Sequence, residues 1–505
     1  MSEDPGRPVT GPGGPPATAA DKADGGLRAR AARGVVWAAA EKWLVRASTL
    51  VGFVILGRLL EPAEFGVVAL AMVFITLLTV VTEGGFGIFL VQRPTIDRTV
   101  ATTTFVVSAG LGLVLAPALA LAAPLLADLL DTPALAQVLP ALAVALLVAS
   151  LSVVPASLLQ RDLRFRDLAV RQVVATGLSV VVAVVLAFAG AGVWALVAQT
   201  LVRSVVAFAV LWWMSDFRPA WTFSRPAARE MLGFGSKSLG IDLLRRVRDE
   251  GEAFLVGVLL GTTALGYWTV ALRLVTVVVD LFSAVLGRVA SPVFARVRED
   301  VPRLGRALGS SMAIAGFVMV PVLVVLALTS EHVVPWVFGS QWVPATGVAA
   351  VLAFRAVAYA LGDFPRVALV VTGAPGAELA VTLGQVCGQV VVLLLVADRG
   401  LVAIALALTG WAVLTWPVRA LLLHRLHGIG AGTYRQVALV VVCAALAAGA
   451  VLGAEAVLDL DGAPYVALAV VGGGAVYLGT AALLCRPTLR EIRAALPVGR
   501  RRGRG

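Results

Sequence analysis

The chain has 505 residues, of which 59% are hydrophobic and only 14% are charged. A typical soluble domain carries about 25% charged residues, so this composition excludes a large soluble enzyme. Lys and Arg number 41 against 30 Asp and Glu, and the net charge is +11. The placement of these basic residues, described below, indicates a membrane protein and no nucleic-acid partner.

Fourteen apolar stretches follow one another along the chain. Each is close to, or longer than, the about 20 residues that a helix needs to cross a bilayer. The intervals between them are too short for a soluble catalytic domain. The sequence therefore predicts an all-α polytopic membrane protein with about 14 transmembrane helices. The stretches are 34–58, 65–90, 101–126, 134–159, 169–190, 192–214, 235–260, 264–290, 307–329, 345–372, 377–397, 401–423, 436–455 and 464–485.

Basic residues concentrate in every second connection and at both ends of the chain. The connection at 160–171 contains four Arg, whereas those at 127–133, 330–343 and 455–463 contain no Lys or Arg. Loops rich in Lys and Arg remain in the cytoplasm during membrane insertion. Both termini are therefore predicted to be cytoplasmic.

The two ends differ in composition from the rest of the chain. Residues 1–33 are rich in Pro and Gly and lack an apolar run, which predicts a disordered cytoplasmic tail. Residues 486–505 form a basic cytoplasmic tail. This tail either contacts anionic lipid headgroups or serves only to orient the chain in the membrane.

A short sequence repeat has an offset of 200 residues. Gly57, Leu59, Leu60, Gly66 and Ala71 correspond to Gly257, Leu259, Leu260, Gly266 and Ala271. Parallel repeats are a recurring design of transporters, with substrate handled between the two halves. The repeat predicts two six-helix bundles at 34–230 and 231–430, with two further helices at 431–485. Chance similarity between two Leu- and Gly-rich hairpins is the alternative.

Several short motifs carry a family resemblance. The segment 56–66, LGRLLEPAEFG, resembles the first external hairpin of polysaccharide exporters, and related motifs recur at 232–235, 261–267 and 338–345. On these motifs, residues 30–430 resemble the Wzx-type oligosaccharide flippases of the multidrug/oligosaccharidyl-lipid/polysaccharide exporter superfamily. The charged segment 245–252 departs from the pattern expected at that place.

The resemblance implies a function and a location. Its members act as flippases for lipid-linked oligosaccharides, with 12 to 14 helices in two bundles around a central cavity. We therefore expect alternating-access transport of an undecaprenyl-pyrophosphate-linked oligosaccharide across the bacterial cytoplasmic membrane, for lipopolysaccharide or another surface polysaccharide. Membrane lipids and polysaccharide polymerase machinery are the expected partners.

Charged residues inside the apolar stretches are candidates for the substrate site, because a charge in the bilayer usually faces a wet cavity or a partner. Lys42 and Arg46 are four residues apart in the first stretch, so they share one helix face. Arg binds pyrophosphate oxygens with paired donors, which favours an anion site. Pairing with an acidic residue of another helix, or extension toward the cytoplasmic surface, is the alternative.

The seventh and eighth stretches add Arg245, Arg248 and Arg273 to this predicted anion cavity. Arg273 and Asp280 are seven residues apart and so lie on one helix face. The seventh stretch could instead neutralise itself through ion pairs within the helix, at four-residue spacing. The pairs expected in that case are Asp242–Arg246, Arg245–Asp249, Arg246–Glu250 and Arg248–Glu252. Arg203, Arg355, Arg366 and Arg419 are isolated and are interpreted as structural or interfacial.

Energy coupling requires a titratable carboxylate or an ion site. Glu41, Asp242 and Asp280 are the candidates, together with Glu83 and Asp363, and the sequence does not rank them. H⁺, Na⁺ or the membrane potential could supply the energy. No catalytic residue, metal site or cofactor is predicted, since the Gly233–Ser238 segment lacks the spacing of a phosphate-binding loop. Two alternative functions remain open. One is a multidrug-type exporter with a mostly apolar cavity, and the other is a membrane-embedded glycosyltransferase or polymerase that uses Asp128 or Asp131.

Overall fold

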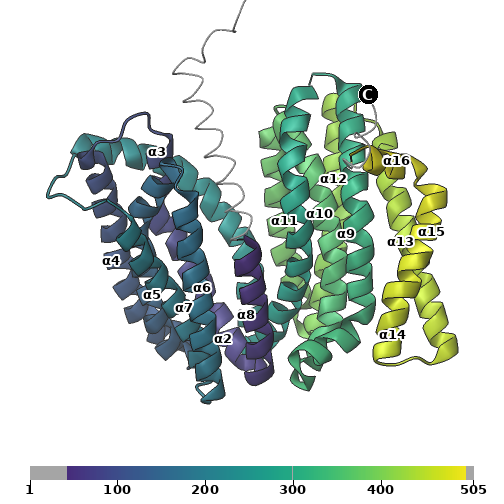
Figure 1. The fold of residues 1–505 in the computed structure, drawn as a ribbon, viewed down its shortest axis with the longest axis horizontal. Helices are drawn as coiled ribbons and strands as arrows, with labels where there is room; N and C mark the ends of the chain where they lie inside the picture. The colour runs from purple at the N-terminus through teal and green to yellow at the C-terminus, as the bar shows by residue number, and fades with distance from the viewer. Residues whose placement is uncertain (1–41, 298, 496–505) are drawn as a thin grey trace, which may run out of the picture.

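The computed structural model describes residues 42–297 and 299–495. The predicted tail at 1–33, the coupling candidate Glu41 and the basic segment 496–505 lie outside the described residues. Within the described chain the secondary structure is helical, without strands (Figure 1). Twelve of these helices are long and apolar enough to cross a membrane. The predicted all-α polytopic fold is confirmed, and the number fourteen stays a prediction.

The first group of helices begins with residues 42–59, which carry Lys42, Arg46 and Arg58. A break at Gly84 and Gly85, whose φ angles are 50° and 70°, separates the next two helices. Only glycine adopts such angles readily. This group, called the N-half here, contains residues 42–59 with α2 (Pro62–Glu83), α3 (Phe86–Gln92), α4 (Arg98–Leu129), α5 (Leu135–Arg161), α6 (Phe165–Phe188) and α7 (Val193–Met214).

The second group, called the C-half, begins with α8 (Arg225–Val297). This helix has two arms that meet at Gly261, where φ is 85° and ψ is 172°. The two arms cover the seventh and eighth apolar stretches. Counting α8 as one helix or as two therefore changes the number of spans. The remaining elements are α9 (Val301–Phe338), η1 (Ser340–Ala345), α10 (Thr346–Val371), α11 (Pro375–Val396), η2 (Ala397–Arg399) and α12 (Leu401–His427).

The last elements pack against α9 at the edge of the C-half (Figure 1). His332 Nε2 and Asp461 Oδ1 are 2.6 Å apart and join α9 to the loop after α13. Tyr477 donates a hydrogen bond of 2.8 Å to the backbone oxygen of Phe317. These elements are η3 (Ala431–Tyr434), α13 (Arg435–Leu458), α14 (Ala463–Ala467), η4 (Leu468–Gly472), α15 (Gly473–Leu484) and α16 (Arg486–Ala495).

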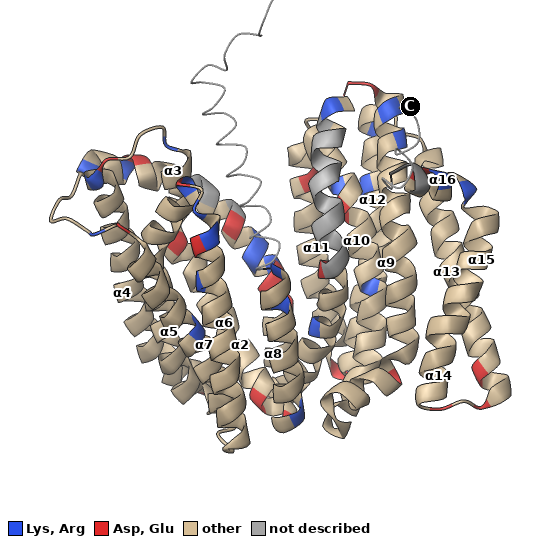
Figure 2. Ribbon diagram, in the orientation of Figure 1, with Lys and Arg blue, Asp and Glu red and all other residues tan. Residues whose placement is uncertain are grey.

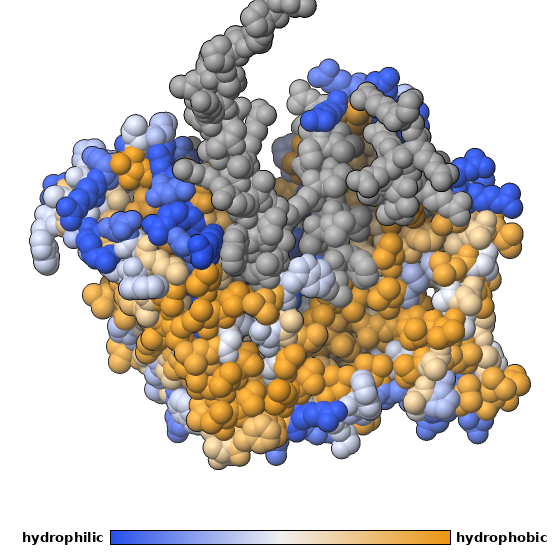
Figure 3. All heavy atoms as spheres, in the orientation of Figure 1, coloured by the Kyte–Doolittle hydropathy of each residue, from blue (hydrophilic) through white to orange (hydrophobic). Residues whose placement is uncertain are grey.

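The surface has the pattern expected of a protein in a bilayer. Figure 3 shows a broad hydrophobic belt with hydrophilic residues at both ends of the helices. Large apolar side chains on the helices are exposed, among them Leu121, Leu395 and Trp213. Exposed apolar surface on this scale is unfavourable in water and favourable in lipid. Basic residues lie mostly at the upper end of Figure 2, as the alternation of basic connections predicts.

The two halves meet in a reciprocal backbone contact between α2 and α8. A Cβ atom at Gly66 would overlap with the carbonyl oxygen of Thr262, and one at Gly266 would overlap with the carbonyl oxygen of Pro62. Each glycine therefore approaches the residue that is equivalent to the partner of the other glycine. Such a pair of contacts is what a two-fold axis produces. It has the same 200-residue offset as the sequence repeat.

Candidate functional site

The lower end of the molecule in Figure 1 is closed by contacts between the two halves. Trp342 Nε1 and Gln341 Nε2 donate hydrogen bonds of 2.7 and 3.0 Å to the backbone oxygen of Gly57. Arg58 Nε donates to the backbone oxygen of Val337 at 2.8 Å. Together with the Gly66 and Gly266 contacts, these bonds seal this end. The motifs at 56–66, 261–267 and 338–345 thus come together in space.

Above this seal the N-half contains a polar cavity of about 700 Å³, called the N-half cavity here. It lies beside the break between α2 and α3, where Gly235 of α8 approaches the backbone of Gly84 too closely for a larger residue. The cavity is thus bounded by α2, α3, α5 and the first arm of α8. Its polar lining consists of Glu83, Gln92, Ser157, Gln160, Asp242, Arg245, Arg246 and Asp249.

The structure therefore brings two of the predicted residues, Arg245 and Asp242, to one cavity. The carboxylate, amide and guanidinium groups that line the cavity offer both hydrogen-bond donors and acceptors. This mixture suits a ligand with many hydroxyl groups better than an apolar ligand or a simple anion.

The predicted ion pairs within the first arm of α8 are partly wrong. Arg248 donates through Nε and Nη2 to Asp249 Oδ1, at 2.9 and 2.8 Å, and not to Glu252. Glu252 instead receives both Nη groups of Arg355 in α10, at 2.8 and 2.7 Å. A bidentate pair of this kind is stronger than a flexible pair on a helix surface. Tertiary packing therefore decides the partner of Glu252.

The first helix and the second arm of α8 are joined by an ion pair. Arg46 Nη2 lies 3.8 Å from Asp280 Oδ2, with both side chains partly exposed. This is the alternative expected for Arg46, a partner on another helix. The distance is long for a salt bridge, so the contact leaves Arg46 donors available to another anion. Lys42, one turn earlier, is exposed.

Arg273 lies on the second arm of α8 and faces another cation. Its charge is close enough to repel that of Arg203 on α7. Neither residue has an ion-pair partner among the residues that the structure describes. Arg203 is exposed and Arg273 is partly buried, and neither lines the N-half cavity. The sequence favours a structural or interfacial role for Arg203, because no pattern in it indicates that α7 and α8 bring this residue near Arg273.

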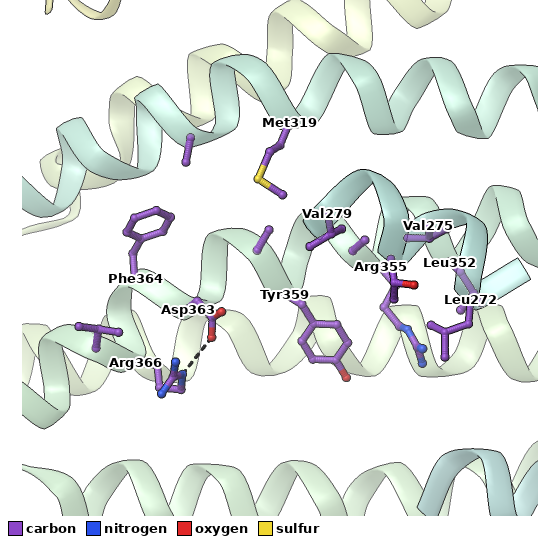
Figure 4. A pocket seen from close by; sticks show the side chains of 15 residues that line it. Leu272, Val275, Val279, Met319, Leu352, Arg355, Tyr359, Asp363, Phe364 and Arg366 are labelled. Atoms are coloured by element: carbon purple, nitrogen blue, oxygen red, sulfur yellow. Dashed lines mark hydrogen bonds and ion pairs between the residues drawn. The ribbon is translucent and has the colours of Figure 1, made fainter. Parts of the chain in front are cut away.

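The C-half contains a smaller and mainly apolar cavity of about 340 Å³, called the C-half cavity here. Figure 4 shows Met319, Phe364 and Val279 around it, with Tyr359 and Arg355 at its polar side. Asp363 and Arg366 at its rim form an ion pair of 2.9 Å. The two halves thus offer cavities of different chemistry.

The C-half contains two buried ion pairs, and Arg355 of one of them lines this cavity. Gln389 donates to Glu252, the partner of Arg355. A second bidentate pair joins Arg419 in α12 to Glu378 in α11, at 2.9 and 2.7 Å. The side chains of the two pairs are exposed by only 7% to 10%. The sequence assigned the two arginines a structural role but did not identify their partners, because spacing along the chain does not show contacts between helices.

The acids considered for a membrane-embedded enzyme lie away from the N-half and C-half cavities. Asp128 and Asp131 are exposed at the turn between α4 and α5 and line neither of the two cavities. No group of three or more His, Cys, Asp or Glu that could hold a metal ion is present among the described residues.

Comparisons with known proteins identify the relatives of the chain. The succinoglycan biosynthesis transport protein ExoT of Rhizobium meliloti is 28% identical over 322 residues, which is 64% of this chain and 65% of ExoT. The lipopolysaccharide biosynthesis protein WzxC of Escherichia coli is 24% identical over 318 residues, 63% of this chain and 65% of WzxC. The matches therefore span about 65% of the length of these relatives.

Solved structures show the same fold at low identity. The lipid II flippase MurJ, in an inward closed conformation, superposes with a TM-score of 0.72 at 12% identity, over 90% of this chain and 100% of MurJ. An inward-facing multidrug transporter of the MATE family gives 0.60 at 17% identity, over 76% and 96%.

A family model described as "Polysaccharide biosynthesis protein" matches residues 55–347. This match covers more than half of the chain and includes the motifs at 56–66, 261–267 and 338–345, which meet at the closed end. It confirms the resemblance found in the sequence. The chain is a multi-span membrane protein that belongs to the polysaccharide biosynthesis protein family.

Proposed function

We propose that this protein translocates an oligosaccharide linked to undecaprenyl pyrophosphate across the bacterial cytoplasmic membrane, for the synthesis of a surface polysaccharide. ExoT is a succinoglycan biosynthesis transport protein and MurJ is a lipid II flippase, and both similarities support this proposal. The observation that carries it is the closeness of two cations from the two halves, Arg203 and Arg273, in a molecule whose large polar cavity carries further charged side chains.

The pyrophosphate occupies the cationic region in this proposal. An anion between Arg203 and Arg273 relieves the repulsion between them, and Arg supplies paired donors for phosphate oxygens. Arg46 exchanges its long contact with Asp280 for a phosphate oxygen when substrate enters. Lys42 adds positive charge one helical turn from Arg46.

The saccharide occupies the N-half cavity in this proposal. Sugar hydroxyl groups donate to carboxylates such as Asp249 and accept from guanidinium groups such as Arg245. The amide side chains of Gln92 and Gln160 can do both. The volume of the N-half cavity, about 700 Å³, lies within the usual range for pockets that bind small molecules.

Transport occurs by alternating access between the two halves. The basic end of the helices faces the cytoplasm, so the sealed end faces outward and the described conformation is closed to the outside. Opening outward requires the Gly57–Trp342 hydrogen bond and the Gly66–Thr262 contact to separate. The translocated lipid-linked unit is then delivered to the polymerase machinery.

We assign coupling to Asp280. Binding of H⁺ or Na⁺ at this carboxylate would weaken its attraction for Arg46 and release that cation to the substrate. Glu252 and Glu378 are less suited, because each is already held by a bidentate arginine.

The proposal is tested by replacing the cations that approach from the two halves. Arg203→Gln and Arg273→Gln should each lower export of surface polymer at least tenfold and trap the complete lipid-linked unit in the cytoplasmic leaflet. Arg399→Gln, an exposed substitution at the sealed end, is the matched control. Export and the amounts of lipid-linked saccharide in each leaflet are measured at equal protein levels. Normal export by both variants and by the double variant would exclude these arginines.

The C-half cavity supports a second candidate function. Its apolar lining, with Met319 and Phe364, also suits a hydrophobic drug. Depletion of the protein separates the two functions. An unchanged set of lipid-linked intermediates together with greater drug sensitivity would favour a multidrug exporter. Units that reach the outer leaflet without being polymerised would instead indicate a polymerase.

A further inference from the structure

A third cavity, separate from the N-half cavity and the C-half cavity, lies at the upper end of the helices. Its volume is about 410 Å³. It is formed where α9 and α13 begin, where α12 ends and where α16 packs against α9. Apolar side chains of the same elements, including Leu304, Leu308 and Ile429, are fully or almost fully buried nearby. We call it the junction cavity, and its polar lining consists of Arg306, Ser310, Thr433, Gln436 and Glu491.

The position of the junction cavity is fixed by close backbone packing. A Cβ atom at Gly309 would lie 2.5 Å from the backbone oxygen of Thr433, so α9 and the loop before α13 touch directly. The spans of α9 and α13 begin at Val301 and Ala431. The cavity is therefore at the depth where lipid headgroups meet water.

Two acceptor atoms in the junction cavity have no partner in the part of the chain that the structure describes. They are Gln436 Oε1 and Glu491 Oε2, and both atoms are buried. A buried polar atom without a hydrogen bond costs about 1–3 kcal/mol, and more if it is charged. Unpartnered acceptors on one wall indicate a ligand that supplies N–H or O–H donors.

A positively charged residue, Arg306, also lines the junction cavity but does not neutralise Glu491. Arg306 forms a hydrogen bond of 3.3 Å to the backbone oxygen of Pro302. Among the described ion pairs, none joins Arg306 to Glu491 within 4.0 Å, although both side chains line the cavity. A guanidinium and a carboxylate that face one space without pairing fit a ligand with separated negative and positive groups. An anion alone would be repelled by Glu491, and a cation alone by Arg306.

We propose that the junction cavity binds the phosphoethanolamine headgroup of a membrane phospholipid. The phosphate accepts from Arg306, and the ammonium group donates to Glu491 and Gln436. Cationic pockets between membrane helices are known to hold lipid headgroups. The ammonium group has three N–H donors, which match the two unpartnered oxygens. The lipid would hold α13 and α16 against α9 at the edge of the C-half.

The test compares lipids that differ only in the headgroup. The full-length protein is purified, stripped of lipid and titrated with phosphatidylethanolamine, phosphatidylcholine or phosphatidylglycerol, and the bound lipid is counted by native mass spectrometry. Phosphatidylcholine retains the phosphate but lacks N–H donors. We expect phosphatidylethanolamine to bind at least tenfold more tightly than phosphatidylcholine. Equal affinity would overturn the proposal.

Substitutions show which residues of the junction cavity produce the preference for phosphatidylethanolamine. Glu491→Gln should remove the preference for phosphatidylethanolamine, and Arg306→Gln should weaken binding of all three lipids, because all three contain phosphate. Asp398→Asn, an exposed carboxylate replacement at the opposite end, is the control and should change nothing. A preference that persists in Glu491→Gln would overturn the proposal.

Two further measurements keep the test decisive. If Glu491→Gln does not fold, Gln436→Glu should increase the preference, since it adds a second carboxylate for the ammonium group, and an unchanged preference would contradict the site. Free phosphoethanolamine is titrated in parallel. Binding of this soluble compound without binding of the lipid would overturn the assignment to a membrane lipid.

Discussion

At the residue scale, the C-half contains charges that are almost completely removed from solvent. Arg355 pairs with Glu252 and also lies 5.5 Å from the ring centre of Trp268. Removing charges from water costs several kcal/mol per ion, so such a pair contributes little net stability, whereas breaking it is costly. Arg355 lines the C-half cavity, so its pair with Glu252 holds one wall of that cavity in place.

Breaking the Glu252–Arg355 pair should destabilise the protein strongly. Glu252→Gln and Arg355→Met should each lower the free energy of unfolding by about 3–5 kcal/mol, because each leaves a buried charge without a partner. The double variant should lose less than the sum of the two. Thermal unfolding of the purified protein measures all three.

A partly exposed pair at the rim of the same cavity provides the control. Asp363→Asn breaks the Asp363–Arg366 pair, whose side chains are 67% and 41% exposed. Its effect should stay within about 1 kcal/mol, because solvent screens the interaction. Equal losses for the exposed and buried pairs would contradict the argument.

Arg46 illustrates what one sequence reveals about a site. A basic residue inside an apolar stretch was sufficient to predict that it faces a cavity or a partner. Its neighbour Asp280 is 234 positions away and was identified only as a candidate for coupling. The contact between them depends on how the first helix lies against α8, and spacing along one helix contains no such information.

At the element scale, most helices follow directly from the sequence. Apolar runs of this length must satisfy their backbone groups internally in a bilayer, and a helix does so. The break after α2 was not predicted, because Gly84 and Gly85 occur within an apolar run that otherwise continues. The glycine pair lets the chain bend beside the N-half cavity and exposes Glu83 to it.

The contact between α2 and α8 should not tolerate a single added methyl group. In Gly66→Ala the new Cβ would overlap with the carbonyl oxygen of Thr262, so α2 and α8 must move apart and the sealed end should open. Export should fall, and Leu265→Cys, buried in the native chain, should become reactive to a membrane-impermeant maleimide. Cys387, Cys443 and Cys485 are first replaced by Ala.

Gly110→Ala in α4 is the matched control, because a Cβ there meets no atom within 4 Å. Alanine favours a helix over glycine by about 1 kcal/mol, so this variant should be at least as stable as the native chain. Unaltered labelling of Leu265→Cys in the Gly66→Ala background would show that the contact does not seal this end.

At the scale of the whole molecule, the distribution of charge predicts the orientation in the membrane. The upper end in Figure 2 contains most of the basic residues, and the lower end contains few. Loops with many Lys and Arg are retained in the cytoplasm. The proposed direction of transport depends on this prediction, because in the proposal the sealed end faces outward and substrate enters from the cytoplasm.

Two exposed alanines test the orientation. Ala431 begins η3, just before α13, and Ala463 begins α14 at the other end of the molecule. In the same cysteine-free background, Ala463→Cys should react with an impermeant maleimide added to intact cells, whereas Ala431→Cys should react only after permeabilisation. Both are Ala-to-Cys substitutions at exposed positions, so each serves as the control of the other. The reverse pattern would place the basic end outside and overturn the proposed direction.

The sequence by itself determined the class of the protein, its helices, the family resemblance and the expectation of a cationic cavity. These follow from local properties: apolar length, charge placement and short motifs such as 56–66. Only the tertiary structure decided that Arg203 approaches Arg273, that Glu252 pairs with Arg355 and not with Arg248, and that Gly66 contacts Thr262. These contacts depend on how separate helices pack, and a single sequence does not encode that packing in any local pattern.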